Sequence, residues 1–194
     1  MRERVCRFAN ARRRAEALAE LGLDTVDIDE ILASLGGDGD VEALLDGPFR
    51  LDRSYTPSPT RFSDGSWRVF YASRNWDTAA AEIGYHVRKA AEGSSVPLFY
   101  QRLCCTMVGI GFDLCPHLTR FPFLTAPSET DAYPRCQRLA REAMEDGADA
   151  LLTHSARVAG VNVPVFRRSA LSEPRIVGSA AIALGTGHHD IQLY

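Results

Sequence analysis

The chain has 194 residues, a formal net charge of −3 at pH 7, 45% hydrophobic residues and 24% charged residues. These values are typical of a soluble globular protein that is long enough to bury a substantial core. The weak negative charge gives no electrostatic reason to expect direct nucleic-acid binding, and no apolar run is long enough to span a membrane. The Arg-rich start lacks the apolar stretch of a secretory signal, so we expect a cytoplasmic protein.

Residues 1–48 are predicted to form a helical N-terminal extension that packs on the main domain or on a partner. Val5–Leu21 has helical patterning, and its basic cluster Arg12–Arg14 is interpreted as a solvated helix face because two glutamates follow closely. A second short helix is expected over Val41–Leu45, before Gly47-Pro48.

A turn, a strand and a helix are expected to follow one another between residues 61 and 91. Ser63–Ser66 is a cluster of turn-forming residues, and Trp67–Ala72 is rich in the aromatic and β-branched residues typical of strands. Asp77 is the predicted N-cap of a helix over residues 78–91. Arg61, Tyr71 and Glu82 therefore lie on three successive pieces of secondary structure, in an order that suits a site for a phosphorylated ligand with a ring.

Glu82 lies at the edge of the apolar stripe of this helix, which predicts a half-buried carboxylate. Burying a carboxylate costs several kcal/mol, of the order of 5, unless it is paired or hydrogen-bonded. Two interpretations stay open on this evidence: Glu82 forms a structural ion pair with an arginine, or it faces a cleft.

The second half is predicted to complete an α+β domain, with Phe112–Pro127 as a loop. One amphipathic helix is expected over Asp131–Glu145, ended by Gly147. The expected strands are Leu98–Ile110, Ala150–His154, Val161–Phe166 and Ile176–Leu184.

The five cysteines are expected to be reduced and to act as small core residues. They include adjacent Cys104 and Cys105 but no Cys-x-x-Cys pair, which suits neither a disulfide framework nor a zinc site. His188–Asp190 has no third ligand group at suitable spacing and is interpreted as a plain tail, so no metal site is predicted.

These segments together resemble the RES domain, named for its Arg, Glu and Ser and found in bacterial toxins that consume NAD. The resemblance covers about residues 49–185, with Thr60 in place of the usual glycine of the family's turn. The segments that carry it are Phe49–Leu51, Thr60–Gly65, Val69–Ala72, Thr78–Glu82, Gly147–Arg157 and Gly160–Phe166. It implies ADP-ribosyltransferase-like mixed β-sheets flanked by helices around an NAD cleft, with residues 49–194 as the catalytic domain.

The resemblance and the residue types suggest a role for each candidate. Cleavage of the nicotinamide–ribose bond creates a cationic ribose, which the carboxylate of Glu82 is suited to stabilise. Arg61 is the first candidate to bind the diphosphate and Arg50 the second, since guanidinium groups form paired, charge-assisted hydrogen bonds with phosphates. Tyr71 is expected to pack against nicotinamide.

Two further residues, Ser155 and Asn162, are assigned to NAD binding. A hydroxyl at Ser155, after an apolar strand, can hydrogen-bond the substrate or brace Glu82, whereas a nucleophilic role would need a base that His154 is poorly placed to supply. Taken alone, each candidate residue also has a purely structural interpretation, as a surface turn arginine, a core-edge tyrosine or a strand cap.

The leading hypothesis is the toxin of a toxin–antitoxin pair that passes ADP-ribose from NAD to water or phosphate. NAD would then be a substrate and no cofactor is expected, because the chain lacks both a Gly-x-Gly-x-x-Gly fingerprint and a phosphate-loop motif. An antitoxin that blocks the active site is the expected partner, and a homo-oligomer stays open. One alternative is an ADP-ribosyltransferase that modifies a protein, and another is an inactive module that binds a partner in a DNA-bound regulatory complex.

Overall fold

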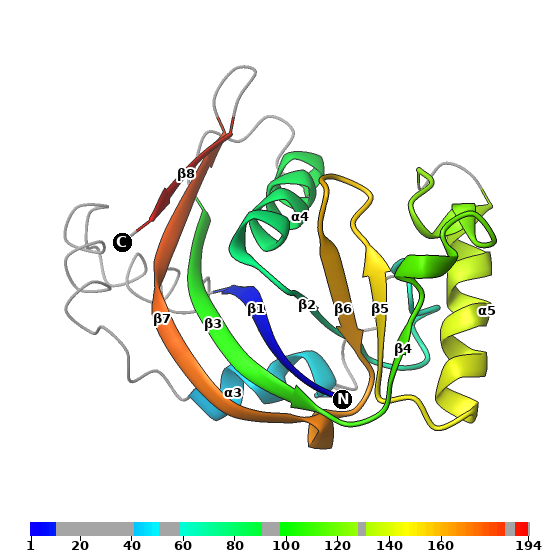
Figure 1. Cartoon of the computed structure of the whole chain (residues 1–194). Helices are drawn as coiled ribbons and strands as arrows, with labels where there is room; N and C mark the ends of the chain where they lie inside the picture. The colour runs from blue at the N-terminus through cyan, green and yellow to red at the C-terminus, as the bar shows by residue number, and fades with distance from the viewer. Residues whose placement is uncertain (11–40, 51–58, 91–97, 128–130, 185–188, 194) are drawn as a thin grey trace.

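Eight strands form one mixed sheet in the computed structural model, with helices packed on both faces and at one end (Figure 1). The structure describes residues 1–10, 41–50, 59–90, 98–127, 131–184 and 189–193. The strands are β1 Arg2–Asn10, β2 Phe70–Ser73, β3 Leu98–Val108, β4 Gly111–Asp113, β5 Ala150–His154, β6 Val161–Val165, β7 Leu171–Leu184 and β8 His189–Leu193. The helices are α3 Val41–Asp46, α4 Trp76–Ala90 and α5 Ala132–Glu145.

The strand order is β4-β5-β6-β2-β1-β3-β7-β8. Only the β4–β5 pair is parallel, and the other neighbouring pairs are antiparallel. The predicted α+β class with a mixed sheet flanked by helices is therefore confirmed. In the part of the chain that the structure describes, no helix is long and apolar enough to cross a membrane.

The first ten residues correct the prediction of a helical extension. Arg2–Asn10 is strand β1, which pairs with β3 along its whole length and lies between β2 and β3 in the sheet. Val5 and Ala9 belong to one buried cluster and Phe8 to another, so this short run is apolar towards both faces. A strand buried on both faces lacks polar alternation and is easily mistaken for a helix by pattern alone. The basic cluster Arg12–Arg14 lies outside the described residues.

The two faces of the sheet are covered by different helices. Helix α4 packs on the face that carries Phe8 and Tyr100, whereas α3 contributes Leu45 to the cluster around Val5 and Phe70. Because successive residues of a strand point to opposite faces, Val5 and Phe8 place α3 and α4 on opposite sides of the sheet. Arg168 holds α3 in place by a 2.6 Å bond from its Nε to Asp46.

Helix α5 packs beside β5 and buries Cys136, Ala140 and Ala143 against the end of the sheet (Figure 1). Its amphipathic pattern was readable in the sequence, and so was its end at Gly147, which takes a left-handed φ of 87°. The short helix near residues 41–45 and the strand bounds of β5 are also confirmed.

Several element boundaries differ from prediction. Strand β7 begins at Leu171 rather than Ile176, and the expected loop after Phe112 contains the end of β4 and two 3-10 turns. The predicted plain tail is wrong for His189–Leu193, which pairs with β7 as an edge strand. All five cysteines are free, as expected, and all but Cys115 are buried.

Candidate active site

The start of helix α4 fixes the position of the candidate carboxylate. Asn75, rather than the predicted Asp77, caps the helix: its Oδ1 accepts from the Thr78 backbone N at 2.9 Å and from Thr78 Oγ1 at 2.8 Å. Gly160, in the loop between β5 and β6, lies so close that a Cβ there would be 1.9 Å from Thr78 Oγ1. The first turn of α4 is thereby held against this loop, and Glu82 follows one turn later.

Glu82 is held by two side chains from distant parts of the chain. Ser155 Oγ donates to Glu82 Oε1 at 2.7 Å, and Asn162 Nδ2 donates to the same oxygen at 2.6 Å. Ser73 Oγ in turn donates to Asn162 Oδ1 at 2.9 Å, which orients the amide so that its NH₂ group faces Glu82. Of the two interpretations left open by the sequence, the structure favours a carboxylate that faces a cleft over a structural ion pair.

Ser155 braces Glu82 from behind the pocket. Its Oγ accepts from the backbone N atoms of Arg157 at 3.0 Å and Val158 at 3.3 Å, so its one proton is directed to Glu82. The residue is 8% exposed and is not among those that line the pocket. This geometry supports the role of Ser155 in bracing Glu82, and its direct bonding to a substrate stays a prediction.

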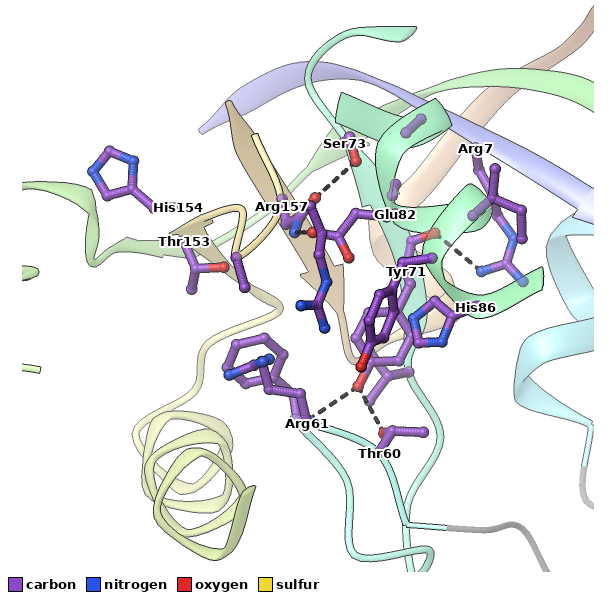
Figure 2. A pocket seen from close by; sticks show the side chains of 18 of the residues that line it. Arg7, Thr60, Arg61, Tyr71, Ser73, Glu82, His86, Thr153, His154 and Arg157 are labelled. Atoms are coloured by element: carbon purple, nitrogen blue, oxygen red, sulfur yellow. Dashed lines mark hydrogen bonds between the residues drawn. The ribbon is translucent and has the colours of Figure 1, made fainter. Parts of the chain in front are cut away.

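A cavity of about 500 Å³ opens beside Glu82 (Figure 2). Its described charged lining consists of three arginines, Arg7, Arg61 and Arg157, and a single carboxylate, Glu82. Pockets of this size are typical of small-molecule and cofactor sites. The excess of guanidinium groups indicates an anionic ligand.

Tyr71 presents its ring to this cavity while its hydroxyl is tied to the wall. The Phe62 backbone N donates to Tyr71 Oη at 3.0 Å, and Tyr71 Oη and Thr60 Oγ1 share a hydrogen bond of 2.7 Å in which either hydroxyl can be the donor. Burial raises the pKa of Tyr71 to about 12, so the phenol is neutral near pH 7. A neutral ring with an occupied hydroxyl is suited to stacking more than to proton transfer.

Arg61 lines the cavity, but much of its guanidinium is committed to the loop before α5. Its Nη1 donates to Leu124 O at 3.0 Å and its Nη2 to Ala126 O at 2.9 Å, and its Cζ lies 5.0 Å from the centroid of the Tyr133 ring. The positive charge stays at the cavity wall, whereas most of the fork that would bind a phosphate is occupied.

Arg50 does not join the site. It is exposed, its Nη2 lies 3.9 Å from Asp46 Oδ2, and it is not part of the described pocket lining, so the structure does not bring it to the cavity where its predicted role in diphosphate binding would place it. The segment before it, Gly47–Phe49, is a 3-10 turn. Arg61, Tyr71, Glu82 and Asn162 are the predicted site residues that the structure brings to one cavity.

Two arginines of the site were missed in the sequence. Strands β1 and β2 are paired at Cys6 and Ser73. Arg7 lies next to this pair, and its Nη1 donates to Tyr71 O at 3.1 Å. Burial lowers the pKa of Arg7 to about 10, which still leaves it charged near pH 7.

Arg157, the second of these arginines, lies over the Tyr85 ring, with its Cζ 3.4 Å from the ring centroid. Its position two residues after Ser155 was the one available signal in the sequence. Arg7 gave no such signal because it stands in a segment interpreted as helix.

An α+β domain with one braced carboxylate in an arginine-lined cavity has the features of an enzyme or receptor for a small anionic ligand. The family model of the RES domain matches residues 40–184, and the chain therefore belongs to the RES domain family. Comparison with curated proteins finds no match.

Among solved structures, the chain is similar to one from the M. tuberculosis MbcT–MbcA toxin–antitoxin complex. The two share 14% sequence identity with a TM-score of 0.48, and the alignment covers 94% of this chain and 85% of that one.

Proposed function

We propose that the protein cleaves the bond between nicotinamide and ribose in NAD and passes ADP-ribose to water or phosphate. The observation that carries this proposal is the carboxylate of Glu82, fixed by Ser155 and Asn162 at the wall of a cavity whose other described charged groups are arginines. Membership of the RES family supports it, because the family resemblance implies NAD as the substrate.

The chemistry needs a negative charge at the sugar. As the C–N bond breaks, its electron pair leaves with nicotinamide, which becomes neutral, and the ribose becomes an oxocarbenium-like cation. A carboxylate that is already oriented stabilises this charge without reorganising during the reaction. Both recorded donors bond to Oε1 of Glu82, which leaves Oε2 as the oxygen directed to the substrate.

Binding of the two ends of the ligand is distributed over the other walls. The Tyr71 ring supplies a flat surface for nicotinamide, and the cationic wall suits the diphosphate. The second product bond forms when water or phosphate donates an oxygen lone pair to the ribose carbon, and the proton of that nucleophile passes to solvent or to the carboxylate. In this proposal the residues of the chain bind and orient NAD and stabilise the transition state, and NAD is consumed as a substrate.

Transfer to a protein side chain instead would make the chain an ADP-ribosyltransferase. This alternative uses the same bond cleavage and differs only in the acceptor that reaches the ribose. The alternative of an inactive binding module is disfavoured by the Ser73–Asn162–Glu82–Ser155 hydrogen-bond network, because a carboxylate buried for no purpose is costly to maintain.

We further propose that the protein is the toxin of a toxin–antitoxin pair. The basis is membership of the RES family, whose resemblance implies bacterial toxins that consume NAD. An enzyme that depletes NAD harms its own cell, so the expected partner is an antitoxin that covers the cavity beside Glu82. Coexpression with such a partner should restore the growth of cells that the protein alone inhibits.

The direct test is incubation of the purified chain with NAD, with and without phosphate, and identification of the products by mass. Nicotinamide with ADP-ribose indicates hydrolysis, nicotinamide with a phosphorylated ADP-ribose indicates phosphorolysis, and a labelled protein indicates ADP-ribosyl transfer. Glu82→Gln should lower kcat by about a hundredfold or more if the carboxylate stabilises the transition state. Full activity of this variant, or intact NAD in every reaction, would remove the proposal.

A further inference from the structure

We infer that Arg157, stacked on Tyr85, is the residue that binds the phosphate next to the reacting ribose. This inference rests on the proposed function for the identity of the ligand, but its evidence is separate. Arg157 belongs to the loop between β5 and β6, and Tyr85 belongs to α4, one helical turn beyond Glu82. Both side chains line the cavity.

Arg157 is a cation whose hydrogen-bonding capacity is not satisfied by the described protein. No acceptor for its guanidinium lies among the described residues, and the group instead contacts the Tyr85 ring. Its Nε is enclosed by protein, as is that of Arg7, so a ligand in the cavity would bond the terminal nitrogens of the guanidinium. In Figure 2 the guanidinium of Arg157 points into the cavity between Glu82 and Tyr71.

The other two arginines of the cavity are less available. Three carbonyl oxygens of residues 123–126 accept from Arg61. Arg7 also has an Nε without an acceptor among the described residues and lies over the Phe70 ring, but its Nη1 donates to Tyr71 O. Both therefore serve partly as structural donors. One face of the Arg157 guanidinium stacks on the Tyr85 ring, and its terminal nitrogens have no acceptor among the described residues. A guanidinium in this arrangement can bind an oxyanion through two parallel hydrogen bonds.

The charge of Arg157 also limits what can lie beside it. A guanidinium close to the reacting sugar would oppose the positive charge that develops there, unless an anion stands between them. A phosphate on the 5′ carbon of that ribose meets this requirement, because its negative charge compensates Arg157 while Glu82 faces the sugar. The ligand class is therefore a ribosyl phosphate or diphosphate.

The hydroxyl of Ser155 positions both the backbone of Arg157 and the carboxylate of Glu82. Ser155 Oγ bonds the Arg157 backbone N and Glu82 Oε1, so the phosphate-binding residue and the carboxylate share one anchor. Tyr85 then limits the rotation of the guanidinium, which lowers the entropy lost when a ligand binds.

The test is calorimetric binding of three probes to the full chain: ADP-ribose, inorganic diphosphate and nicotinamide riboside, which lacks phosphate. Arg157→Gln should raise the dissociation constants of ADP-ribose and diphosphate about 10- to 100-fold, as expected for loss of a charged hydrogen-bonding group, and leave that of nicotinamide riboside unchanged. Arg88→Gln removes the same charge from an exposed position of α4 outside the cavity and should bind all three probes as the wild type does.

Arg157→Lys provides a second test of the inference if the Arg157→Gln variant folds poorly. It keeps the charge but loses the planar fork, so its affinity for ADP-ribose should fall while its melting temperature stays near that of the wild type. Unchanged ADP-ribose affinity in both Arg157 variants overturns the inference, and so does an equal loss for all three probes.

The two proposals can fail separately. If the wild type does not cleave NAD but binds diphosphate in a manner that requires Arg157, the proposed reaction is wrong and the phosphate site stands. If NAD is cleaved and Arg157→Gln leaves both kcat and KM unchanged, the phosphate assignment is wrong and the reaction stands.

Discussion

Ser155→Ala is the most informative single change, because Ser155 joins the carboxylate to the loop that carries Arg157. The substitution removes the 2.7 Å bond to Glu82 Oε1 and leaves the backbone N atoms of Arg157 and Val158 without their side-chain acceptor. It creates little empty space, since only one oxygen is lost. The effect is therefore almost purely one of hydrogen bonding.

The expected magnitude follows from the bond to the charged group. A hydrogen bond to a carboxylate contributes about 1.5–3 kcal/mol, and 1.4 kcal/mol corresponds to a tenfold change in rate, so kcat for NAD cleavage should fall about 10- to 100-fold. The free energy of unfolding should fall by a similar amount, about 1.5–3 kcal/mol. Ser172→Ala, at an exposed position of β7, is the matched control and should change neither quantity by more than about 0.5 kcal/mol.

Two assays measure this effect: steady-state NAD cleavage and urea unfolding of the same variants. The decisive comparison is a double-mutant cycle with Glu82→Gln, in which Ser155→Ala should cost about 1–2 kcal/mol less stability in the Gln background than in the wild type. This readout does not depend on turnover. Equal costs in the two backgrounds, or a Ser155→Ala protein as active and stable as Ser172→Ala, would refute the view that Ser155 braces Glu82.

Two other predictions concern packing and ionisation. Gly160→Ala should destabilise the protein by about 1–3 kcal/mol, measured by urea unfolding, because its Cβ would stand 1.9 Å from Thr78 Oγ1; Gly47→Ala, with nothing within 4 Å, is the control and should be tolerated. Burial raises the pKa of both the Cys6 and Cys105 thiols from 9.0 to about 12, so the folded protein retains these protons where the unfolded chain releases them. The free energy of unfolding under reducing conditions should consequently fall as the pH rises from 9 to about 12, and Cys105→Ala should make this fall shallower. A constant stability across that range would contradict the assignment.

Local signals in the sequence were sufficient for the elements that have one apolar face. Helix α5 and its end at Gly147 could be predicted because apolar residues recur at helical spacing and a glycine follows. Strand β5 was bounded correctly because its apolar run is short and is preceded by a turn residue. The same reasoning failed for β1, since a central strand packed on both faces has no polar side to reveal its period.

The site was predicted where its residues are close in sequence. Arg61, Tyr71 and Glu82 occupy consecutive elements, and the structure places them around one cavity. Arg7 was beyond reach, because its contribution depends on β1 lying next to β2, a pairing between segments more than 60 residues apart. The network that fixes Glu82 has the same origin: partners 73 and 80 residues away are brought together only by the completed sheet.

That long-range bracing affects how the protein is made. Glu82 is synthesised well before Ser155 and Asn162, so a growing chain contains the carboxylate before it contains the two residues that donate to it. The residues of β6 must be synthesised before both hydrogen bonds can fix the orientation of the carboxylate. A prematurely terminated copy that ends before β6 would therefore lack the fixed carboxylate on which the proposed activity depends.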